Sequence, residues 1–178
     1  MKRISILFSL CLSIWSFAQI QWISIEDLIE VQELKPKKIL INFYEKNCDV
    51  CDKVDKLTYT HPIIATLIKE NYYAVKFNIE DKSQFSAFGR NFNNKGDLQS
   101  LKSYHEFAKY LNVVAAPTVV FLDEDLSLIT KLQGYFSPKE MEPFLYSIAT
   151  NQYRKINSKE QWLQYQRKFK TKIKDEYK

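Results

Sequence analysis

Two cysteines separated by two residues are the part of this sequence with the clearest chemical meaning. Cys48 and Cys51 lie in the stretch KNCDVCDK at positions 46–53. A pair at this spacing can bind a metal, form a fixed disulfide, or cycle between a dithiol and a disulfide. The choice among the three depends on what surrounds the pair.

The start of the chain bears on the redox compartment. Lys2 and Arg3 precede a short apolar run, and small residues, Ser16 and Ala18, follow it. This layout is typical of a secretory signal peptide, so we expect residues 1–18 to be removed after Ala18. The apolar run is shorter than the roughly 20 residues that a membrane-spanning helix needs. We therefore predict an exported protein of the periplasm or cell envelope.

The cysteine count then favours chemistry over stapling. Cys11 would leave with the signal peptide, and a lipid anchor there is disfavoured because Leu10 stands where a small residue is needed. The mature chain would keep only Cys48 and Cys51. Disulfide scaffolds usually carry several pairs at wide spacing. One close pair in a well-cored exported domain favours a redox function.

Composition sets broad limits on the class of protein. The chain has 178 residues and is 46% hydrophobic, enough for one domain with an appendage. Removing residues 1–18 would remove two of the 26 basic residues and none of the 21 acidic ones, which lowers the net charge from +5 to +3. So mild a charge does not suggest a nucleic-acid partner.

Hydrophobic periodicity predicts helices that alternate with strands, and a hairpin near the end. Strands joined by helices pair in parallel, whereas a hairpin adds antiparallel strands, so we expect an α/β fold with a central mixed sheet. The predicted elements are a helix over 25–34, a strand over 39–45, a helix over 50–59 that breaks near 60–62 and resumes to about 70, a strand over 72–80, an insertion over about 81–100 with room for a small hairpin, a helix over 101–113, a hairpin over 118–135, and helices over 138–152 and 159–174.

This order places Cys48 at the turn between a strand and a helix. Thiolate is the attacking species, and the free N–H groups and dipole at a helix N-terminus favour it. Cys51, one helical turn later, would lie behind Cys48. We expect Cys48 to attack a disulfide and Cys51 to resolve the mixed disulfide.

Three stretches resemble the thioredoxin superfamily in order and spacing over about 22–150. INFYEKNCDVC resembles its active-site strand and loop, VVAAPTVVFLDED its cis-proline and next strand, and LQGYFSPKE its closing strand and last helix. The chain is similar to exported bacterial thioredoxin-like proteins related to the periplasmic domain of DsbD. The resemblance implies a thioredoxin-like domain over 19–155, with an insertion before the cis-proline region and a C-terminal helical extension over 156–178.

The resemblance also implies roles for single residues. Cys48 matches the family nucleophile and Cys51 the resolving cysteine. Pro117 matches the cis-proline, and a cis bond there would let Ala116 offer its backbone N–H and C=O to an extended substrate. Tyr44 falls on an aromatic family position and is expected to wall the site. Protein thiols and disulfides are the implied clients, with a membrane protein as electron donor and no cofactor.

The chain departs from the family near the cysteines, at Asn42, at Asn47 and at the motif centre Asp49-Val50, where thioredoxin has Gly-Pro. The buried acid that assists proton transfer in thioredoxin aligns with Asn42, which cannot titrate. Glu45 is a candidate replacement, although a solvated acid at a strand end is the simpler interpretation. Asn47 stands where the family has tryptophan before the first cysteine.

Asp49, between the cysteines, bears on the direction of electron flow. A negative charge beside Cys48 disfavours its thiolate and raises its pKa, which favours the disulfide. Lys46 and Lys53 offset part of this effect. We therefore expect a reducing protein, nearer thioredoxin's potential of about −270 mV than DsbA's of about −120 mV.

Two other functions stay open at this point. A metal site would need more ligands than the cysteines, and His61 and His105 read more simply as a surface and a packed residue; copper delivery is one form of this alternative. A non-catalytic binding module is the other. Its interface would be the C-terminal helix, whose aromatic and apolar stripe more simply packs on the domain; the stripe comprises Trp162, Tyr165, Phe169 and Ile173.

Overall fold

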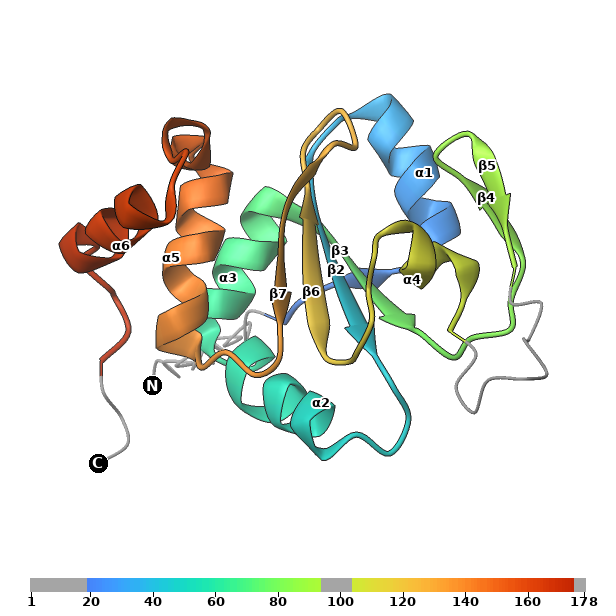
Figure 1. The fold of residues 1–178 in the computed structure, drawn as a ribbon, viewed down its shortest axis with the longest axis horizontal. Coiled ribbons are helices and arrows are strands. Elements are labelled where there is room, and N and C mark those ends of the chain that lie inside the picture. The colour runs from blue at the N-terminus through green and yellow to red at the C-terminus, as the bar shows by residue number, and fades with distance from the viewer. Residues whose placement is uncertain (1–18, 94–103, 175–178) are drawn as a thin grey trace, which may run out of the picture.

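The computed structural model describes residues 19–93 and 104–174, so the predicted signal peptide and the end of the insertion lie outside the described residues. Five strands form the main sheet, and helices cover both of its faces (Figure 1). In chain order the elements are β1 (Trp22–Ile23), α1 (Ile25–Leu34), β2 (Lys38–Tyr44), α2 (Asp49–Lys53), the π-helix η1 (Val54–Tyr59), α3 (Pro62–Asn71), β3 (Tyr72–Asn78), β4 (Phe85–Ala87), β5 (Arg90–Phe92), α4 (Glu106–Tyr110), β6 (Thr118–Leu122), β7 (Leu128–Gln133), α5 (Pro138–Ala149), the 3₁₀ helix η2 (Gln152–Lys155) and α6 (Lys159–Lys168).

The main sheet is mixed, as the sequence predicts. Its strand order is β1-β3-β2-β6-β7. β1, β3 and β2 run parallel, whereas β6 pairs antiparallel with both β2 and β7. The central strand β2 is buried on both faces, which explains its uninterrupted apolar run.

The two faces of the sheet support two separate core layers. Because side chains alternate along a strand, Ile39, Ile41 and Phe43 point to one face and Leu40 to the other. The first face packs on α1, α4 and the β4–β5 hairpin, and the second on η1, α3 and α5 (Figure 1). Asn42 shares the second face with Leu40, so it points toward the layer that contains the helix after the cysteines.

Local signals set several boundaries. Ser24 and Asp27 form a capping box at the start of α1, and Ser137 and Glu140 form the predicted one at α5. The insertion contains the small hairpin β4–β5, which turns at Phe88 (φ 53°) and Gly89 (φ 72°). Two successive positive φ angles are typical of a two-residue hairpin turn.

Two predicted helices are shorter than the sequence suggests. The part of the 101–113 prediction that is described holds only α4, which starts after His105 because the His105 Nδ1 accepts a hydrogen bond from the Phe107 amide at 3.1 Å. The prediction over 159–174 is wrong beyond Lys168. The chain turns back there, and the buried carboxylate of Glu142 accepts hydrogen bonds from the Thr171 hydroxyl and, at 3.0 Å, from the Lys172 amide.

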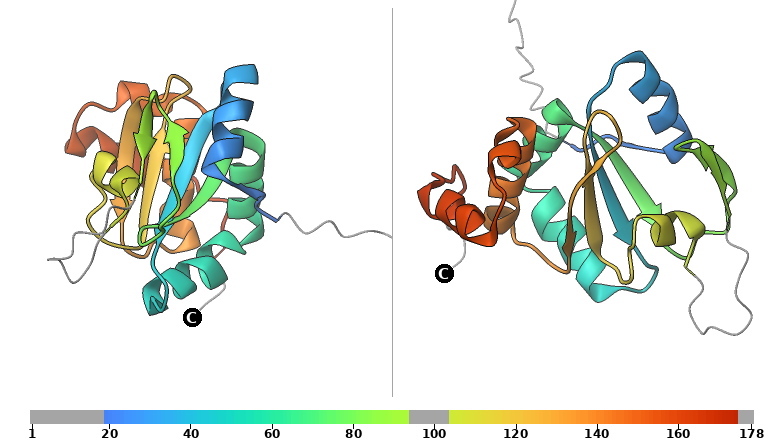
Figure 2. Two further views of the ribbon diagram at one scale, coloured as in Figure 1. Left: turned by 90° about the vertical axis from the view of Figure 1, so that its right-hand side faces the viewer. Right: turned by 45° about the horizontal axis from the view of Figure 1, so that its top comes forward.

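The C-terminal extension lies on the outer side of α5, away from the sheet (Figures 1 and 2). Trp162 packs on Phe144 with ring centroids 4.3 Å apart and ring planes tilted by 32°, and Phe169 contacts Tyr146 with centroids 5.6 Å apart. Ile173 is buried in the same core layer as α3 and α5. The aromatic and apolar stripe therefore packs on the domain, although only its first part is helical.

Candidate functional site

The two cysteines form a disulfide where the chain leaves the sheet. Cys48 and Cys51 are bonded, and their Cα atoms lie 5.2 Å apart. β2 ends at Tyr44, and the loop that follows turns through Asn47, whose φ is 55°. Asparagine tolerates this left-handed conformation better than most residues. The turn delivers Cys48 to the first position of the next helix.

Cys48 is the N-cap of α2. The Cys51 amide donates a hydrogen bond to the Cys48 sulfur at 3.1 Å, and the Asp52 amide bonds to the Cys48 carbonyl at 3.0 Å. A helix N-terminus that donates to a sulfur favours its thiolate form. Cys48 is half-buried, whereas Cys51 is only 4% exposed. Cys48 is thus the sulfur that a partner can reach first.

The peptide bond between Ala116 and Pro117 is cis, as the sequence predicts. It directly precedes β6, whose first residue, Thr118, pairs with Phe43 near the end of β2. Because the two strands are antiparallel, the start of β6 and the end of β2 lie at the same edge of the sheet (Figure 1). The cis-proline segment and the disulfide loop therefore share that edge.

The charged residues next to the disulfide face solvent. Lys46 and Asp49 are exposed. Lys53 is also exposed, and its ammonium lies 4.1 Å from the ring centroid of Tyr135. A cation at this distance from an aromatic face is attracted to the ring. Lys53 therefore has a defined contact, on the segment between β7 and α5.

Tyr44 and Glu45 lie on opposite faces of the sheet edge. The ring of Tyr44 lies 5.0 Å from the Lys76 ammonium, on the α2 side. Glu45 accepts a hydrogen bond from the Tyr104 hydroxyl at 3.0 Å, and Tyr104 packs against the core layer that contains α1 and α4. The structure thus turns Glu45 away from the helix that carries Cys51.

A group of polar side chains lies between the sheet and the helix after Cys51; we call it the polar layer. Asn42 pairs with Lys76 in the β2–β3 register, and the Lys76 ammonium bonds to the Asp55 carboxylate at 2.5 Å. Tyr59 contributes a buried hydroxyl, and burial followed by the Asp55 charge raises its pKa well above the usual range. The four members are Asn42, Asp55, Tyr59 and Lys76.

Sequence reasoning had pointed only to Asn42 in this group. A signal for Asp55 exists, since it follows Cys51 by four residues and such residues are neighbours on a helix. Lys76 had no comparable signal. Its position opposite Asn42 depends on the register between β2 and β3, which only the fold reveals.

The histidines of the alternative metal site are both helix caps. His61 precedes α3, and its Nδ1 accepts a hydrogen bond from the Ile63 amide at 3.3 Å. His105 is fully buried, stacks on Phe85 and contacts the Ser83 carbonyl at 2.9 Å. Over residues 19–93 and 104–174, no group of three or more His, Cys, Asp or Glu side chains is placed to hold a metal ion.

A second polar cluster lies at the other edge of the sheet, and we call it the Lys38 network. The Lys38 ammonium contacts the Asp123 carboxylate at 2.5 Å and Glu124 at 3.3 Å, while Arg154 approaches Asp123 at 2.9 Å. The Tyr153 hydroxyl donates to Asp123 as well. Burial would raise the pKa of Asp123, but the hydrogen bonds from Lys38 and Tyr153 outweigh burial and hold this pKa well below its usual range.

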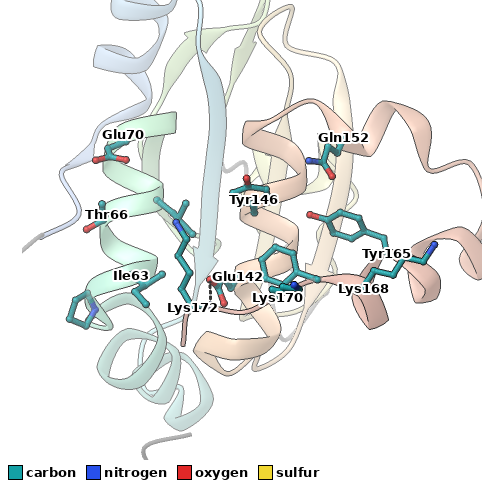
Figure 3. A pocket seen from close by; sticks show the side chains of 13 residues that line it. Ile63, Thr66, Glu70, Glu142, Tyr146, Gln152, Tyr165, Lys168, Lys170 and Lys172 are labelled. Atoms are coloured by element: carbon teal, nitrogen blue, oxygen red, sulfur yellow. Dashed lines mark hydrogen bonds between the residues drawn. The ribbon is translucent and has the colours of Figure 1, made fainter. Parts of the chain in front are cut away.

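A large groove lies elsewhere on the domain. It has a volume of ≈ 640 Å³, and α3, α5 and the C-terminal segment form its walls (Figure 3). Glu142 lies at its floor beside Tyr146, and Lys172 reaches in from the C-terminal segment (Figure 3). No residue of the disulfide loop or of the cis-proline segment lines it. The groove is therefore separate from the cysteine chemistry.

Residues 25–149 match the family model described as a thioredoxin-like domain. The chain belongs to this thioredoxin-like family. The match spans the disulfide loop, the cis-proline and the whole main sheet apart from β1. No curated protein matches the chain by sequence.

Solved structures show the same fold at low sequence identity. A thioredoxin-fold protein from Helicobacter pylori is 20% identical, with a TM-score of 0.56 over 85% of this chain and 87% of that one. A thioredoxin from Thermus thermophilus is 14% identical, with a TM-score of 0.56 over 75% and 89%. The oxidoreductase DsbH is 16% identical, with a TM-score of 0.50 over 78% and 87%.

Proposed function

We propose that this protein is a thiol–disulfide oxidoreductase of the bacterial cell envelope that reduces disulfides in other proteins. The observation that carries the proposal is the pairing of a reachable Cys48 at a helix N-terminus with a buried Cys51 bonded to it. A fixed staple would need neither the amide aimed at the Cys48 sulfur nor the cis-proline segment at the same edge. The thioredoxin-like family supports thiol–disulfide exchange in general.

The reaction has two exchange steps. The Cys48 thiolate attacks one sulfur of the client disulfide; an S–S bond forms between Cys48 and the client, and the other client sulfur leaves with the electron pair and takes a proton. The Cys51 sulfur, having lost its proton, then attacks Cys48 and expels the second client sulfur. The client gains two electrons and two protons, and the protein becomes the disulfide seen here.

Clients would bind along the edge that the two segments share. The backbone of Ala116, before the cis bond, would pair with an extended client chain, and the ring of Tyr44 would wall the other side. Asp49 is exposed beside Cys48 and disfavours extra negative charge there. We infer a reducing couple, and a measured potential above roughly −180 mV, the value of protein disulfide isomerase, would contradict it.

The decisive experiment is an insulin-reduction assay on the mature chain with a chemical reductant as electron source. The wild type should accelerate reduction, and Cys48→Ser should abolish the acceleration because no nucleophile remains. Cys51→Ser should instead retain clients as mixed disulfides on Cys48, which mass spectrometry of a cell-envelope extract would identify. An active Cys48→Ser variant would contradict the proposal.

The groove of Figure 3 supports a second candidate, a binding module that needs no cysteine chemistry. The two candidate functions predict different behaviour for one variant, in which both cysteines are serine. Changing both cysteines to serine leaves every residue that lines the groove intact. A cellular function that survives in this double variant would favour the binding module, and a function lost there would favour the reductase.

Export is part of the proposal and rests on the N-terminal sequence pattern. Among residues 19–93 and 104–174, no helix is long and apolar enough to cross a membrane. An envelope reductase needs electrons from inside the cell, so we infer a membrane protein as donor. N-terminal sequencing of the protein recovered from the envelope should begin at Gln19, and a start at Met1 would contradict cleavage.

A further inference from the structure

We propose that a basic groove beside the disulfide helix binds an acidic segment of the client protein whose disulfide Cys48 attacks. The inference rests on the proposed function and names the chemistry of the partner. The groove has a volume of ≈ 600 Å³ and shares only Pro62 with the groove of Figure 3. Its walls come from α2 and η1, from the segment that leads from β7 into α5, and from the C-terminal segment. We call it the basic groove.

The basic groove carries positive charge without a compensating carboxylate. Lys53, Lys56 and Lys174 are exposed and line it from two sides, and Lys139 lines it as well. No Asp or Glu is among the described residues that form its walls. A cleft lined by one sign of charge concentrates ligands of the opposite sign. The basic groove therefore favours an acidic ligand.

Two acids on the elements around the groove are engaged elsewhere. Glu140 accepts hydrogen bonds from the Ser137 amide at 2.8 Å and from the Ser137 hydroxyl at 2.7 Å, which caps the start of α5. Asp55 pairs with Lys76 beneath the helix. The lysines, rather than the N-terminus of α5, thus supply the positive charge of the groove.

The basic groove adjoins the edge that holds the disulfide and the cis-proline. The Gly134 amide donates to the Pro117 carbonyl at 2.8 Å, and Tyr135, the next residue, forms part of the groove wall. From the other side, the Lys53 ammonium lies over the Tyr135 ring, so α2 and the connection from β7 to α5 are neighbours (Figure 1). A client chain at the cis-proline can therefore continue into the groove.

The helical wall and the wall before α5 are tied together. The Thr58 hydroxyl of η1 donates to the Phe136 carbonyl at 2.6 Å. A groove with walls fixed in advance orders fewer groups when a ligand binds. The helical wall also contains a π-helix, a rare distortion that occurs frequently at functional sites.

The C-terminal segment forms the third side of the groove. Ile173 is buried beneath it, and the Glu142 carboxylate holds the preceding residue by accepting a hydrogen bond from the Lys172 amide at 3.0 Å. Lys174 follows directly and lines the groove. Both Ile173 and Lys174 lie outside residues 25–149, which match the family model. The groove thus depends on a part of the chain that the family model does not include.

A polypeptide segment fits the basic groove better than a lipid surface does. The groove is concave, and Leu57, Tyr135 and Ile173 add apolar surface between its lysines. Leu57 is 44% exposed and available for contact. A bilayer surface is broad and would meet the lysines at the rim without filling the interior. We therefore expect an acidic segment that also carries apolar side chains.

The positions of the lysines predict where the client should carry its acids. Lys53 and Lys56 follow Cys48 by five and eight residues. This separation corresponds to about 7–12 Å along a helix. An extended chain covers about 3.3 Å per residue, so we expect the acids about two to five residues from the client cysteine.

The test is a competition between two peptide disulfides for the Cys51→Ser protein, which retains clients on Cys48. Each probe is a symmetric disulfide of a synthetic peptide with one cysteine. One peptide has glutamates and a leucine within five residues on each side of the cysteine, and the other has glutamines in place of the glutamates. The Cys48 thiolate attacks the disulfide, one peptide stays bonded to Cys48, and the other leaves as a thiolate.

Mass spectrometry of samples quenched early by acid gives the ratio of the two adducts. The acidic adduct should exceed the neutral one by roughly tenfold at low salt, the lower end of the range for electrostatic steering. The ratio should fall toward one as added salt screens the charges. The ratio obtained with β-mercaptoethanol, a neutral thiol without a groove, corrects for the intrinsic reactivity of the probes.

Two double variants separate the groove from overall charge. Lys56→Gln with Lys174→Gln should lower the ratio by about threefold or more. Lys168→Gln with Lys170→Gln is the matched control, because these exposed lysines line only the groove of Figure 3 and the net charge changes equally. The control should change the ratio by less than about twofold. A ratio of adducts cancels any change in the reactivity of Cys48.

Charge reversal completes the test. Lys56→Glu with Lys174→Glu should prefer a third probe, with lysines in place of the glutamates, over the acidic probe. Equal trapping of the acidic and neutral probes, or equal losses in the two glutamine variants, would overturn the inference. Sedimentation with phosphatidylglycerol vesicles that needs both lysines, while the adduct ratio stays near one, would also overturn it and assign the surface to a membrane. Failure to trap any probe, with no insulin reduction by the wild type, would instead overturn the proposed function.

Discussion

The two edges of the sheet carry polar clusters of opposite character. At the Lys38 edge, each buried polar group of the cluster has a partner: Asp123 is bonded to Lys38, Tyr153 and Arg154. At the disulfide edge, the polar layer keeps a buried amide oxygen on Asn42 without a partner among the described residues. Satisfied networks hold a fold together, whereas unsatisfied buried groups cost stability. We take the first edge as structural and the second as the place where stability is given up for chemistry.

Removing Lys38, the central cation of the Lys38 network, should have the largest effect on the free energy of unfolding. Lys38→Met leaves Asp123 buried without its main partner, and breaking a buried pair on one side costs about 3–5 kcal/mol. Urea unfolding should report that loss. Insulin reduction by the folded fraction should stay normal, because Lys38 lies at the edge away from the cysteines.

Lys35→Met is the matched control, since Lys35 is an exposed lysine three residues earlier. It should change the free energy of unfolding by less than about 0.5 kcal/mol. Equal effects of the two substitutions would show that the Lys38 network contributes little, and the comparison between the edges would fail.

Acid should weaken the Lys38 edge next. The pKa of Asp123 is lowered in the folded state because its hydrogen bonds outweigh burial. The ionised carboxylate therefore adds to the free energy of unfolding above the unfolded pKa of about 3.9. This stabilisation is lost as the pH falls through the folded pKa. Since the slope is at most about 1.4 kcal/mol per pH unit below the unfolded pKa, we expect this group to cost about 1 kcal/mol of stability by pH 3 and more at lower pH. Urea titrations at pH 7 and pH 3 measure the loss. Asp123→Asn should lose less between the two pH values than the wild type.

Replacing a buried amide by leucine should change the free energy of unfolding in opposite directions at the two edges. Asn42→Leu replaces a buried, unpartnered amide oxygen by a side chain with the same number and branching of heavy atoms and should stabilise the fold by about 1–2 kcal/mol. Gln32→Leu removes a buried amide near Lys38 that has three hydrogen bonds, with Lys37 and Glu124, and should destabilise it. Chemical unfolding of both variants decides. A loss of stability in Asn42→Leu would mean that the amide is satisfied after all.

The smallest expected effect concerns the exposed charge between the cysteines. Asp49→Asn removes a negative charge beside Cys48, which stabilises the thiolate and makes the couple more oxidising. An exposed charge is worth at most about 1 kcal/mol, or about 20 mV for two electrons. Equilibration with glutathione measures the potential. Glu160→Gln, an exposed acid on α6, should leave it unchanged, and a more negative potential in Asp49→Asn would reverse the role given to Asp49.

Much of this could be predicted because it is local. The strand before the cysteines, the helix caps at Ser24 and Ser137, and the hairpin β6–β7 follow from periodicity and from short capping motifs. The errors also have local causes. The helix predicted to run to residue 174 ends at Lys168 because a distant carboxylate, Glu142, competes for the backbone N–H of Lys172. Periodicity along one segment contains no information about such a partner.

The sequence by itself determined the cysteine pair and its position at a strand-to-helix turn, because both depend on neighbours within a few residues, whereas the cis bond at Pro117 was predicted only from the resemblance to the thioredoxin superfamily. Only the tertiary structure decided which charged side chains meet beneath the helix that follows Cys51. It turned Glu45 to the opposite face of the sheet, placed Lys76 opposite Asn42 through the β2–β3 register, and paired Lys76 with Asp55. The physical reason is that strand register sets the distance and the burial of side chains that lie far apart in the chain.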